Sequence, residues 1–289
     1  MAFDPFLYVA FGVGLLAGWL VRPESPWVGR ATLVSVVVLV GLLGASLNAV
    51  AGGALLLEIP IALAFTLLVL GLTIGVYLAI VRARPAPSRP PDPRDRRERF
   101  PVSAALLGAL LGGYALGHFV ALPTATGIQW ALYALLALVG FGLKLRFGGL
   151  SGVWVPLTAA VVGAGAGAAL FALLARVPLG ISLSTSLAFG FYSLAGPLVA
   201  ARAGAVFGLL AFLANFLRED LTMLLSPLLG RRLRGEGLAA MGGATAMDTT
   251  LYFVTRYGDP DAGSLAIASG LVLTVVASLV VPAALTLPV

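Results

Sequence analysis

The sequence predicts an all-α integral membrane protein, and three observations support this. Of the 289 residues, 60% are hydrophobic and only 10% are charged, whereas soluble domains carry roughly 25% charged residues. Several apolar runs approach or exceed the roughly 20 residues with which a helix crosses about 30 Å of hydrocarbon. The alternating ten-residue segments that are typical of a transmembrane barrel do not occur.

Hydropathy divides the chain into ten apolar segments. They cover residues 5–21, 31–51, 58–81, 102–122, 127–146, 153–175, 182–201, 203–229, 237–257 and 262–286. The first is expected to be a retained helix rather than a signal peptide, because no Lys or Arg precedes it. A Pro- and Arg-rich loop, 82–101, separates the third segment from the fourth. We therefore expect three regions: 1–100 with the first three segments and this loop, 101–178 with the next three, and 179–289 with the rest.

The basic residues predict the orientation of the segments. Seven arginines lie between Arg82 and Arg99, which by the positive-inside rule places this loop in the cytoplasm. A nucleic-acid-binding arm is the less economical interpretation, so no nucleic-acid partner is expected. The first six segments then alternate from an amino terminus outside the cell. Arg22, Arg30, Lys144 and Arg146 all fall inside, in agreement with the rule.

Two later segments break this alternation. If 182–201 crossed the membrane, Arg231, Arg232 and Arg234 would fall outside, so we expect 182–201 to enter from the outer side and return. The segment 237–257, rich in small and polar residues, is expected to dip from the cytoplasmic side. The prediction is eight crossings plus two re-entrant segments, with both termini outside; ten crossings are the alternative. Irregular backbone at membrane depth implies a pathway, because it must be buried in protein or line a wet cavity.

A weak internal sequence similarity predicts inverted repeats. The stretch "LVGLLGASL" (39–47) is similar to "LVGFGLKL" (138–145), and the two lie in segments that run in opposite directions. Segments one to three and four to six are therefore predicted to be related by inverted topology, a common plan of transporters.

The stretch "NFLREDLTML" (215–224) places three charges inside an apolar segment. Such a charge costs about 2.5–3.5 kcal/mol on insertion scales and is a functional hypothesis by default. Helical spacing puts five polar residues on one face: Asn215, Arg218, Glu219, Thr222 and Ser226. Asp220 lies about 100° away from Glu219. The alternative is that Arg218 forms a buried ion pair with a neighbouring acid and serves packing alone.

Two further polar stretches lie in the expected re-entrant segments. In 242–258, Asp248 is flanked by Thr245, Thr249 and Thr250, whose hydroxyls can ligate an ammonium group or a small cation; the alternative is that Asp248 caps a helix. In "SLSTSLAFGFYSLAGP" (182–197), a broken helix is predicted from Gly190, Tyr192, Ser193, Gly196 and Pro197. Exposed amides at such a break can bind a carboxylate, whereas the alternative is an outer-leaflet turn with an interfacial aromatic residue.

Several classes of function are excluded or disfavoured by the sequence. There is no cysteine and only one histidine, His118, so neither a thiolate metal site nor a histidine cluster can form. No P-loop, His/Glu zinc motif or nucleophile elbow occurs. The chain is therefore not expected to be an enzyme or to hold a cofactor or metal.

Together, "GFYSLAG" (190–196), "NFLRE" (215–219) with Pro227 eight residues after its Glu, and "GATAMD" (243–248) resemble the lysine exporter LysO family of prokaryotic inner membranes. The stretches "GLLGASL" (41–47) and "VGFGLKLR" (139–146) are similar to the family's glycine-ended helix pattern. The resemblance implies export of L-lysine and of analogues such as thialysine, with both termini outside. It assigns the essential intramembrane acids to Glu219 and Asp248. Asp220 departs from the family pattern, in which an apolar residue is usual.

Lysine chemistry suits these residues. Lysine carries two ammonium groups and one carboxylate, and a carboxylate–ammonium contact is strong in a low dielectric. Burial disfavours the charged form of a carboxylate and a nearby cation favours it, so substrate and proton compete, which is the logic of antiport. We expect lysine/proton exchange, with the substrate carboxylate on the amides near Ser193–Gly196 and Arg218 as a further donor. A monovalent cation/proton antiporter, a channel and a non-transporting membrane scaffold are the alternatives. A homo-oligomer is compatible with the sequence.

Overall fold

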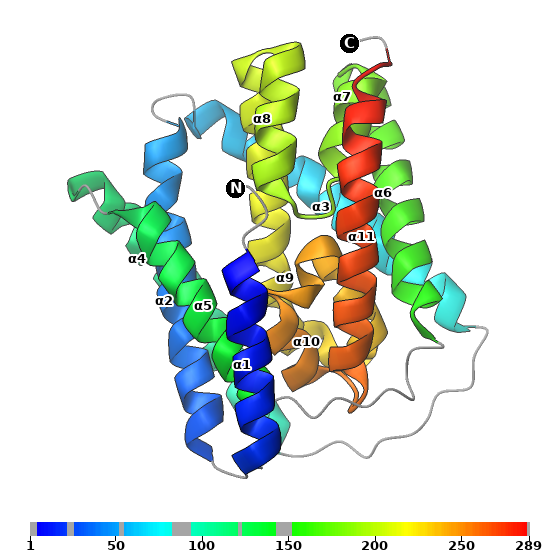
Figure 1. The fold of residues 1–289 in the computed structure, drawn as a ribbon. Coiled ribbons are helices and arrows are strands. Elements are labelled where there is room, and N and C mark those ends of the chain that lie inside the picture. The colour runs from blue at the N-terminus through cyan, green and yellow to red at the C-terminus, as the bar shows by residue number, and fades with distance from the viewer. Residues whose placement is uncertain are drawn as a thin grey trace. The chain divides into compact units, whose positions relative to one another are not determined.

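The computed structural model describes residues 5–21, 26–51, 55–82, 94–120, 123–142 and 152–287, and their regular structure is helical. The elements are α1 (Pro5–Val21), α2 (Pro26–Ala51), α3 (Leu55–Arg82), α4 (Arg94–Phe119), α5 (Thr124–Gly142), α6 (Trp154–Ala175), α7 (Leu179–Ser186), α8 (Tyr192–Ala203), α9 (Ala205–Gly242), the 3₁₀-helix η3 (Gly243–Met247), α10 (Leu251–Tyr257) and α11 (Ala262–Ala284) (Figure 1).

The all-α membrane class is confirmed. Within the described residues, three helices are long and apolar enough to cross a membrane, at Glu58–Arg82, Trp154–Ala175 and Ala262–Ala284. Shorter apolar helical stretches occupy Val9–Val21, Arg30–Ala45, Ala104–Phe119 and Thr126–Leu138. The number of crossings and the sidedness stay predictions.

One predicted boundary is wrong. The loop expected at 82–101 already becomes helical at Arg94, where α4 begins. Charged residues are good helix formers, and the acids in 94–98 suit a helix amino terminus, so the helix starts before its apolar part does. Residues 83–93, and with them part of the expected loop, lie outside the described residues, as do Arg22, Lys144 and Arg146.

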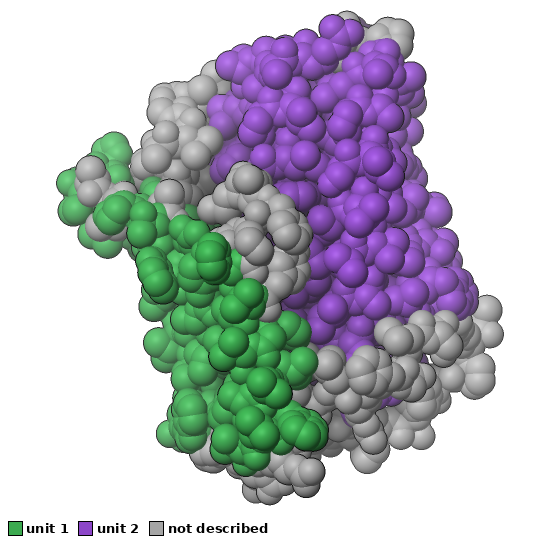
Figure 2. Space-filling view, viewed as in Figure 1, with its two compact units in different colours: residues 1–53, 92–145 green, residues 54–91, 146–289 purple. Residues whose placement is uncertain are grey.

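The chain forms two compact units (Figure 2). The first comprises residues 1–53 and 92–145 and contains α1, α2, α4 and α5. The second comprises residues 54–91 and 146–289 and contains α3 and α6 to α11. The three regions expected along the sequence stay a prediction.

Close glycine contacts hold the first unit together. In it α1 packs on α5, and α2 packs on α4 and α5. Gly14 and Gly18 of α1 lie directly against the carbonyls of Ala137 and Phe141. On α4, Gly113 and Gly117 lie in the same way against residues 41 and 45 of α2. Small residues four positions apart allow such backbone approach, which drives helix association where lipid surrounds the helices.

The second unit contains two helical hairpins. α7 begins and α8 ends beside the carboxyl end of α11: Gly180 lies against the Ala284 carbonyl, and Arg202 Nε donates to the Leu285 carbonyl at 3.3 Å. The chain from α7 through α8 therefore returns to the end from which it came. Figure 1 shows α7 and α8 together at one end of this unit and α10 at the other, with α9 and α11 running between.

The second hairpin is formed by the end of α9, η3 and α10. Within α9 the backbone breaks at Arg234, whose φ of 53° lies in the left-handed region. Beyond this break Gly235 lies against Ala262, at the start of α11, and Gly258 lies against both. The sequence predicted a connection between residues 229 and 237. In the structure the chain changes direction at Arg234 alone, and the residues on both sides of it are helical.

The tips of the two hairpins meet. Phe189 and Gly190 have φ of 53° and 95°, and Gly243 has φ of 66°. The Ala244 amide donates to the Phe189 carbonyl at 2.9 Å. A Cβ on Gly243 would come within 2.9 Å of the Phe189 Cβ, so both its conformation and its space require glycine. The middle of α11 supports this crossing through Gly270, which lies against Met247 and the Ala244 carbonyl.

The glycine contact between α4 and α2 can be tested with neighbouring residues. Gly113→Ala places a methyl group against the Gly41 backbone, and overpacking of this kind costs roughly 1–3 kcal/mol. A Cβ on Gly112 meets nothing within 4 Å, which makes Gly112→Ala the matched control. We expect a lower melting temperature in detergent for Gly113→Ala than for Gly112→Ala. Equal melting temperatures would contradict the contact.

Candidate functional site

Glu219 is the central acid of α9. It is 2% exposed, and its Oε1 has no hydrogen-bond partner. A side-chain hydrogen bond joins it to Thr249, which follows Asp248 at the tip of the second hairpin. The Oε1 atom of Glu219 is therefore left free to accept a hydrogen bond from a ligand.

Asp248 lies between η3 and α10 and is half-buried. Its Oδ1 accepts the Thr249 amide hydrogen at 2.6 Å and lies 3.3 Å from the Thr249 hydroxyl. Asp248 is the C-cap residue of η3, where its backbone N–H donates to the Thr245 carbonyl at 3.1 Å, while Thr250 occupies the N-cap position of α10. Thr249 thus touches both carboxylates and connects α9 to the hairpin tip.

Three acids and one tyrosine gather around this point. Glu219 lies close enough to Asp248 and Asp220 for their charges to interact. Tyr192, the first residue of α8, interacts with all three acids. We call Glu219, Asp220 and Asp248 the carboxylate cluster. Its members come from the middle of α9 and from the tip of the second hairpin, while Tyr192 brings in the first hairpin.

Arg218 does not neutralise this cluster through the ion pair considered above. The guanidinium is 2% exposed. Its Nε donates to the Met241 carbonyl at 3.0 Å and its Nη2 to the Ala240 carbonyl at 3.1 Å, so it caps the last carbonyls of α9. Its Cζ lies 5.9 Å from the Phe189 ring centroid, within cation–π range. Arg218 therefore fastens one hairpin to the tip of the other, and its Nη1 remains without a partner.

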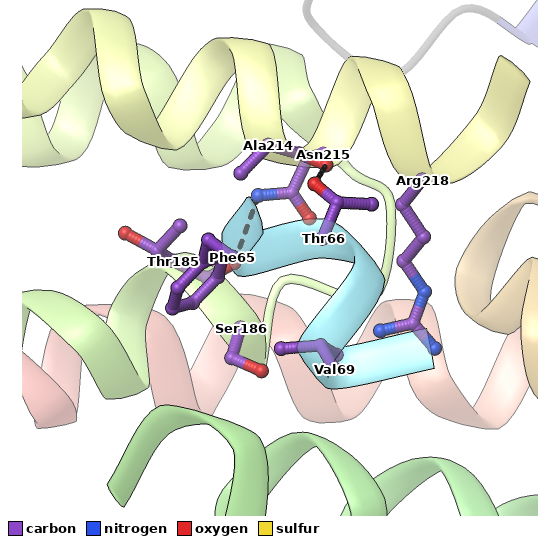
Figure 3. A pocket seen from close by; sticks show the side chains of 8 residues that line it. All are labelled: Phe65, Thr66, Val69, Thr185, Ser186, Ala214, Asn215 and Arg218. Atoms are coloured by element: carbon purple, nitrogen blue, oxygen red, sulfur yellow. Dashed lines mark hydrogen bonds between the residues drawn. The ribbon is translucent and has the colours of Figure 1, made fainter. Parts of the chain in front are cut away.

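A small cavity lies beside Arg218 (Figure 3). It is lined by Phe65, Thr66, Val69, Thr185, Ser186, Ala214, Asn215 and Arg218. The cavity volume available to water is about 10 Å³, which is about enough for one water molecule. Thr185 Oγ1 is buried without a partner, like the Arg218 Nη1. The cavity is mostly apolar with these few polar groups, and it is far too small for an amino acid.

Asn215 holds the first hairpin in place. Its Oδ1 accepts the Gly190 amide hydrogen at 2.8 Å, and its Nδ2 donates to the Thr185 carbonyl at 2.8 Å and to the Ala211 carbonyl at 2.9 Å. The bond to Thr185 is visible in Figure 3. Every hydrogen-bonding group of this amide, except one lone pair, is thereby committed to the backbone around the tip.

The predicted supporting residues fall into two groups. The hydroxyls of Thr222 and Thr245 bond to the carbonyls of Arg218 and Gly242 at 2.8 and 3.0 Å, so both shape the backbone. On α8, the Tyr192 ring lies 5.2 Å from Phe212 and 5.9 Å from Phe216. Gly196 lies against Phe212.

The position of the helix break was predicted too late in the sequence. The non-helical residues are 187–191, and Ser193, Gly196 and Pro197 lie within α8. The strained residue that decides this is Phe189, a non-glycine residue with positive φ, and no sequence pattern marks it. Ser193 remains in the first turn of α8, where the neighbouring amides are already bonded: Tyr192 donates to the Gly190 carbonyl at 2.9 Å, and Leu194 and Ala195 both donate to the Phe191 carbonyl at 3.1 Å.

Sequence reasoning missed the contribution of α3. Thr66, 2% exposed, donates to the Ala62 and Ala214 carbonyls at 2.7 and 2.9 Å, and with Phe65 and Val69 it lines the cavity. Threonines at positions 66 and 73 in an otherwise apolar segment were the available signal. A threonine in an apolar helix does not by itself indicate a site, because its hydroxyl can bond to a carbonyl of its own helix.

Comparison with known proteins identifies the family of the chain. A family model described as "Lysine exporter LysO" matches residues 103–285. The chain belongs to the lysine exporter LysO family. It is 34% identical over 191 residues to the "Lysine exporter LysO" of Escherichia coli (strain K12), covering 62% of this chain and 62% of that protein.

A second relative, the "Putative lysine exporter" of Haemophilus influenzae, is 29% identical over 180 residues, covering 59% of this chain and 89% of that protein. The alignment thus spans less than two thirds of the length of the E. coli protein. No solved structure matches the chain. The matched family region contains the carboxylate cluster and both hairpins.

Removal of the Asn215 amide tests how the first hairpin is held. Asn215→Leu leaves the Gly190 amide and the Thr185 carbonyl buried without these bonds, at about 1–3 kcal/mol for each unsatisfied group. We expect a clear fall in melting temperature in detergent. Ser278→Ala, which removes an exposed hydroxyl bonded within α11, serves as the control. A melting temperature equal to that of the control would show that the amide bonds do not hold the tip.

Proposed function

We propose that this chain exports L-lysine, and analogues such as thialysine, from the cytoplasm in exchange for protons across a prokaryotic inner membrane. The observation that carries the proposal is the convergence of Glu219 and Asp248. They come from different elements, yet they share Thr249 at the crossing of two hairpins inside an apolar helical unit.

The charge of the site favours a cationic substrate. Three acids lie together, and the nearest arginine, Arg218, is occupied by backbone carbonyls. Buried acids without cations are costly, and this cost falls when an ammonium group enters. Glu219 and Asp248 can each accept an ammonium group of lysine, or one can hold the substrate while the other exchanges a proton.

The lysine carboxylate needs donors, and two candidates support the proposal. Arg218 offers its Nη1, which has no partner in the cavity. The second candidate is the Ser193 amide at the amino terminus of α8, since the amides of Tyr192, Leu194 and Ala195 are bonded to nearby carbonyls.

The topology supports transport by alternating access. The two hairpins enter the second unit from opposite ends, which agrees with eight crossings, two re-entrant segments and both termini outside. The cavity beside Arg218 has room for about one water and is not lined by the carboxylate cluster, so we expect the hairpins or neighbouring helices to move when lysine binds. Transporters with such broken segments bind their substrates where these segments meet.

Inverted repeats are supported by the packing of the first unit. If α1 is equivalent to α4 and α2 is equivalent to α5, the α1–α5 contact is equivalent to the α4–α2 contact. The contacting glycines agree with this pairing, since Gly14 is then equivalent to Gly113. Likewise Gly44, which lies against the Leu110 carbonyl, is equivalent to Gly140, which lies against the Phe11 carbonyl. The packing therefore aligns Gly44 with Gly140, whereas the similarity between 39–47 and 138–145 aligns Gly41 with Gly140.

A monovalent cation/proton antiporter is the second candidate, favoured by the Thr249 hydroxyl, which contacts both Asp248 and Glu219. A deletion strain that is sensitive to salt but not to thialysine would favour it over lysine export.

The acids can be tested by neutral replacement. In proteoliposomes loaded with labelled lysine, we expect Glu219→Gln and Asp248→Asn each to lower efflux by about tenfold or more, since a charge-assisted hydrogen bond contributes roughly 1.5–3 kcal/mol. Asp259→Asn, which changes an exposed acid before α11, is the matched control. Efflux retained by both cluster variants would reduce the acids to packing elements.

The proton part has its own test. An outward-directed lysine flux coupled to proton entry should accelerate when the medium outside the proteoliposomes is made more acidic than the lumen, and slow when the gradient is reversed. The experiment is run with the membrane potential clamped. Lysine flux that ignores the imposed gradient would remove proton exchange while leaving lysine export in place.

A further inference from the structure

Asp220 differs from the other two members of the carboxylate cluster in its contacts. It is 2% exposed, and both Oδ1 and Oδ2 are buried without any hydrogen-bond partner. The other two members of the carboxylate cluster each contact Thr249. Asp220 is the one cluster acid with no donor at all.

No basic side chain in the described part of the chain bonds to Asp220. Asp220 follows Phe216 by one turn of α9, and the Phe216 ring packs on Phe212 and on Tyr192 of α8. The titratable groups that interact with it are Glu219 on its own helix and Tyr192. Asp248, on the hairpin tip, adds a third acid near Glu219. Arg218, its neighbour in sequence, is bonded to the carbonyls of the second hairpin.

An ionised carboxylate in this place would be unstable. Burial of an unpaired charge costs several kcal/mol even after relaxation, and proteins avoid the cost by neutralising the group. An apolar side chain would fill the same space without that cost. A carboxyl group gives something that an apolar group cannot: it can take up and release a proton as water enters and leaves.

We propose that Asp220 is a third, separate proton-binding site of the transport cycle. In the closed state described here the carboxyl carries a proton. When the site opens for lysine, water reaches Asp220, the O–H bond breaks, the proton passes to water as hydronium, and the carboxylate keeps the electron pair. On closure the reverse transfer restores the O–H bond. The proposal rests on the proposed lysine/proton exchange and adds one exchanged proton to those bound by Glu219 and Asp248.

The first test counts protons. Purified full-length protein in weakly buffered detergent solution receives L-lysine, while a pH dye reports released protons and calorimetry reports bound lysine. We expect the wild type to release about one proton more per bound lysine than Asp220→Asn. Asp220→Leu should behave like Asp220→Asn, and Asp259→Asn like the wild type. Equal release from the wild type and both Asp220 variants would overturn the proposal.

The second test needs no variant and covers the case in which replacement prevents folding. A hydrophobic carbodiimide reacts with protonated carboxyl groups inside apolar protein, and mass spectrometry locates the adduct. We expect adduct formation on Asp220 in the wild-type protein at neutral pH, with lysine changing its rate. Absence of an adduct on Asp220 at every pH, with and without lysine, would overturn the proposal.

The two tests separate this inference from the proposed function. Wild-type protein that binds no lysine, yet forms the adduct on Asp220, contradicts lysine export and keeps Asp220 as a protonated carboxyl. Wild-type protein that binds lysine and releases the same number of protons as Asp220→Asn keeps lysine export and removes the third proton site.

Discussion

The meeting of two hairpin tips is the constraint on which the rest of the second unit depends. One backbone hydrogen bond, from the Ala244 amide to the Phe189 carbonyl, joins them, and left-handed backbone at Phe189 and Gly243 makes the approach sterically feasible. Broken helices leave amides and carbonyls without helical partners. Asn215 and Arg218 supply many of the missing partners from α9. The same α9 face then delivers Glu219 to Thr249 and Asp248, so structural and chemical residues share one surface.

Neighbouring polar residues of α9 have different roles in this arrangement. Asn215 and Arg218 bind backbone and fix the two tips, whereas Glu219 keeps an oxygen free. Thr222 and Ser226, on the same helical face, close hydrogen bonds with α9 itself at 2.8 and 2.6 Å. An amphipathic stripe in a membrane helix is therefore not one functional unit. It is a series of residues whose polar groups are mostly used by backbone, and the few that are unused mark where a ligand can act.

The electrostatic balance of the site follows from this use of Arg218. Because its guanidinium caps carbonyls rather than carboxylates, the cluster keeps a deficit of positive charge in a low-dielectric interior. The deficit can be met by a cationic substrate or by protons, and a site that accepts either one couples their movements. The geometry thus relates substrate choice to energy coupling through a single feature: no basic side chain of the described residues is bonded to the three acids of the carboxylate cluster.

The sequence by itself determined the helical membrane class, the approximate positions of most helices, the two broken segments and the identity of the acids that meet. Hydrophobicity and charge act through local composition, so they can be recognised in one dimension. The tertiary structure alone decided that the first break lies at 187–191, that Arg234 reverses the chain, and that α3 reaches the cavity with Thr66. It also decided that Arg218 binds carbonyls while Asp220 binds nothing. These outcomes depend on which donor and acceptor come within hydrogen-bond distance after packing, and no local pattern encodes that distance.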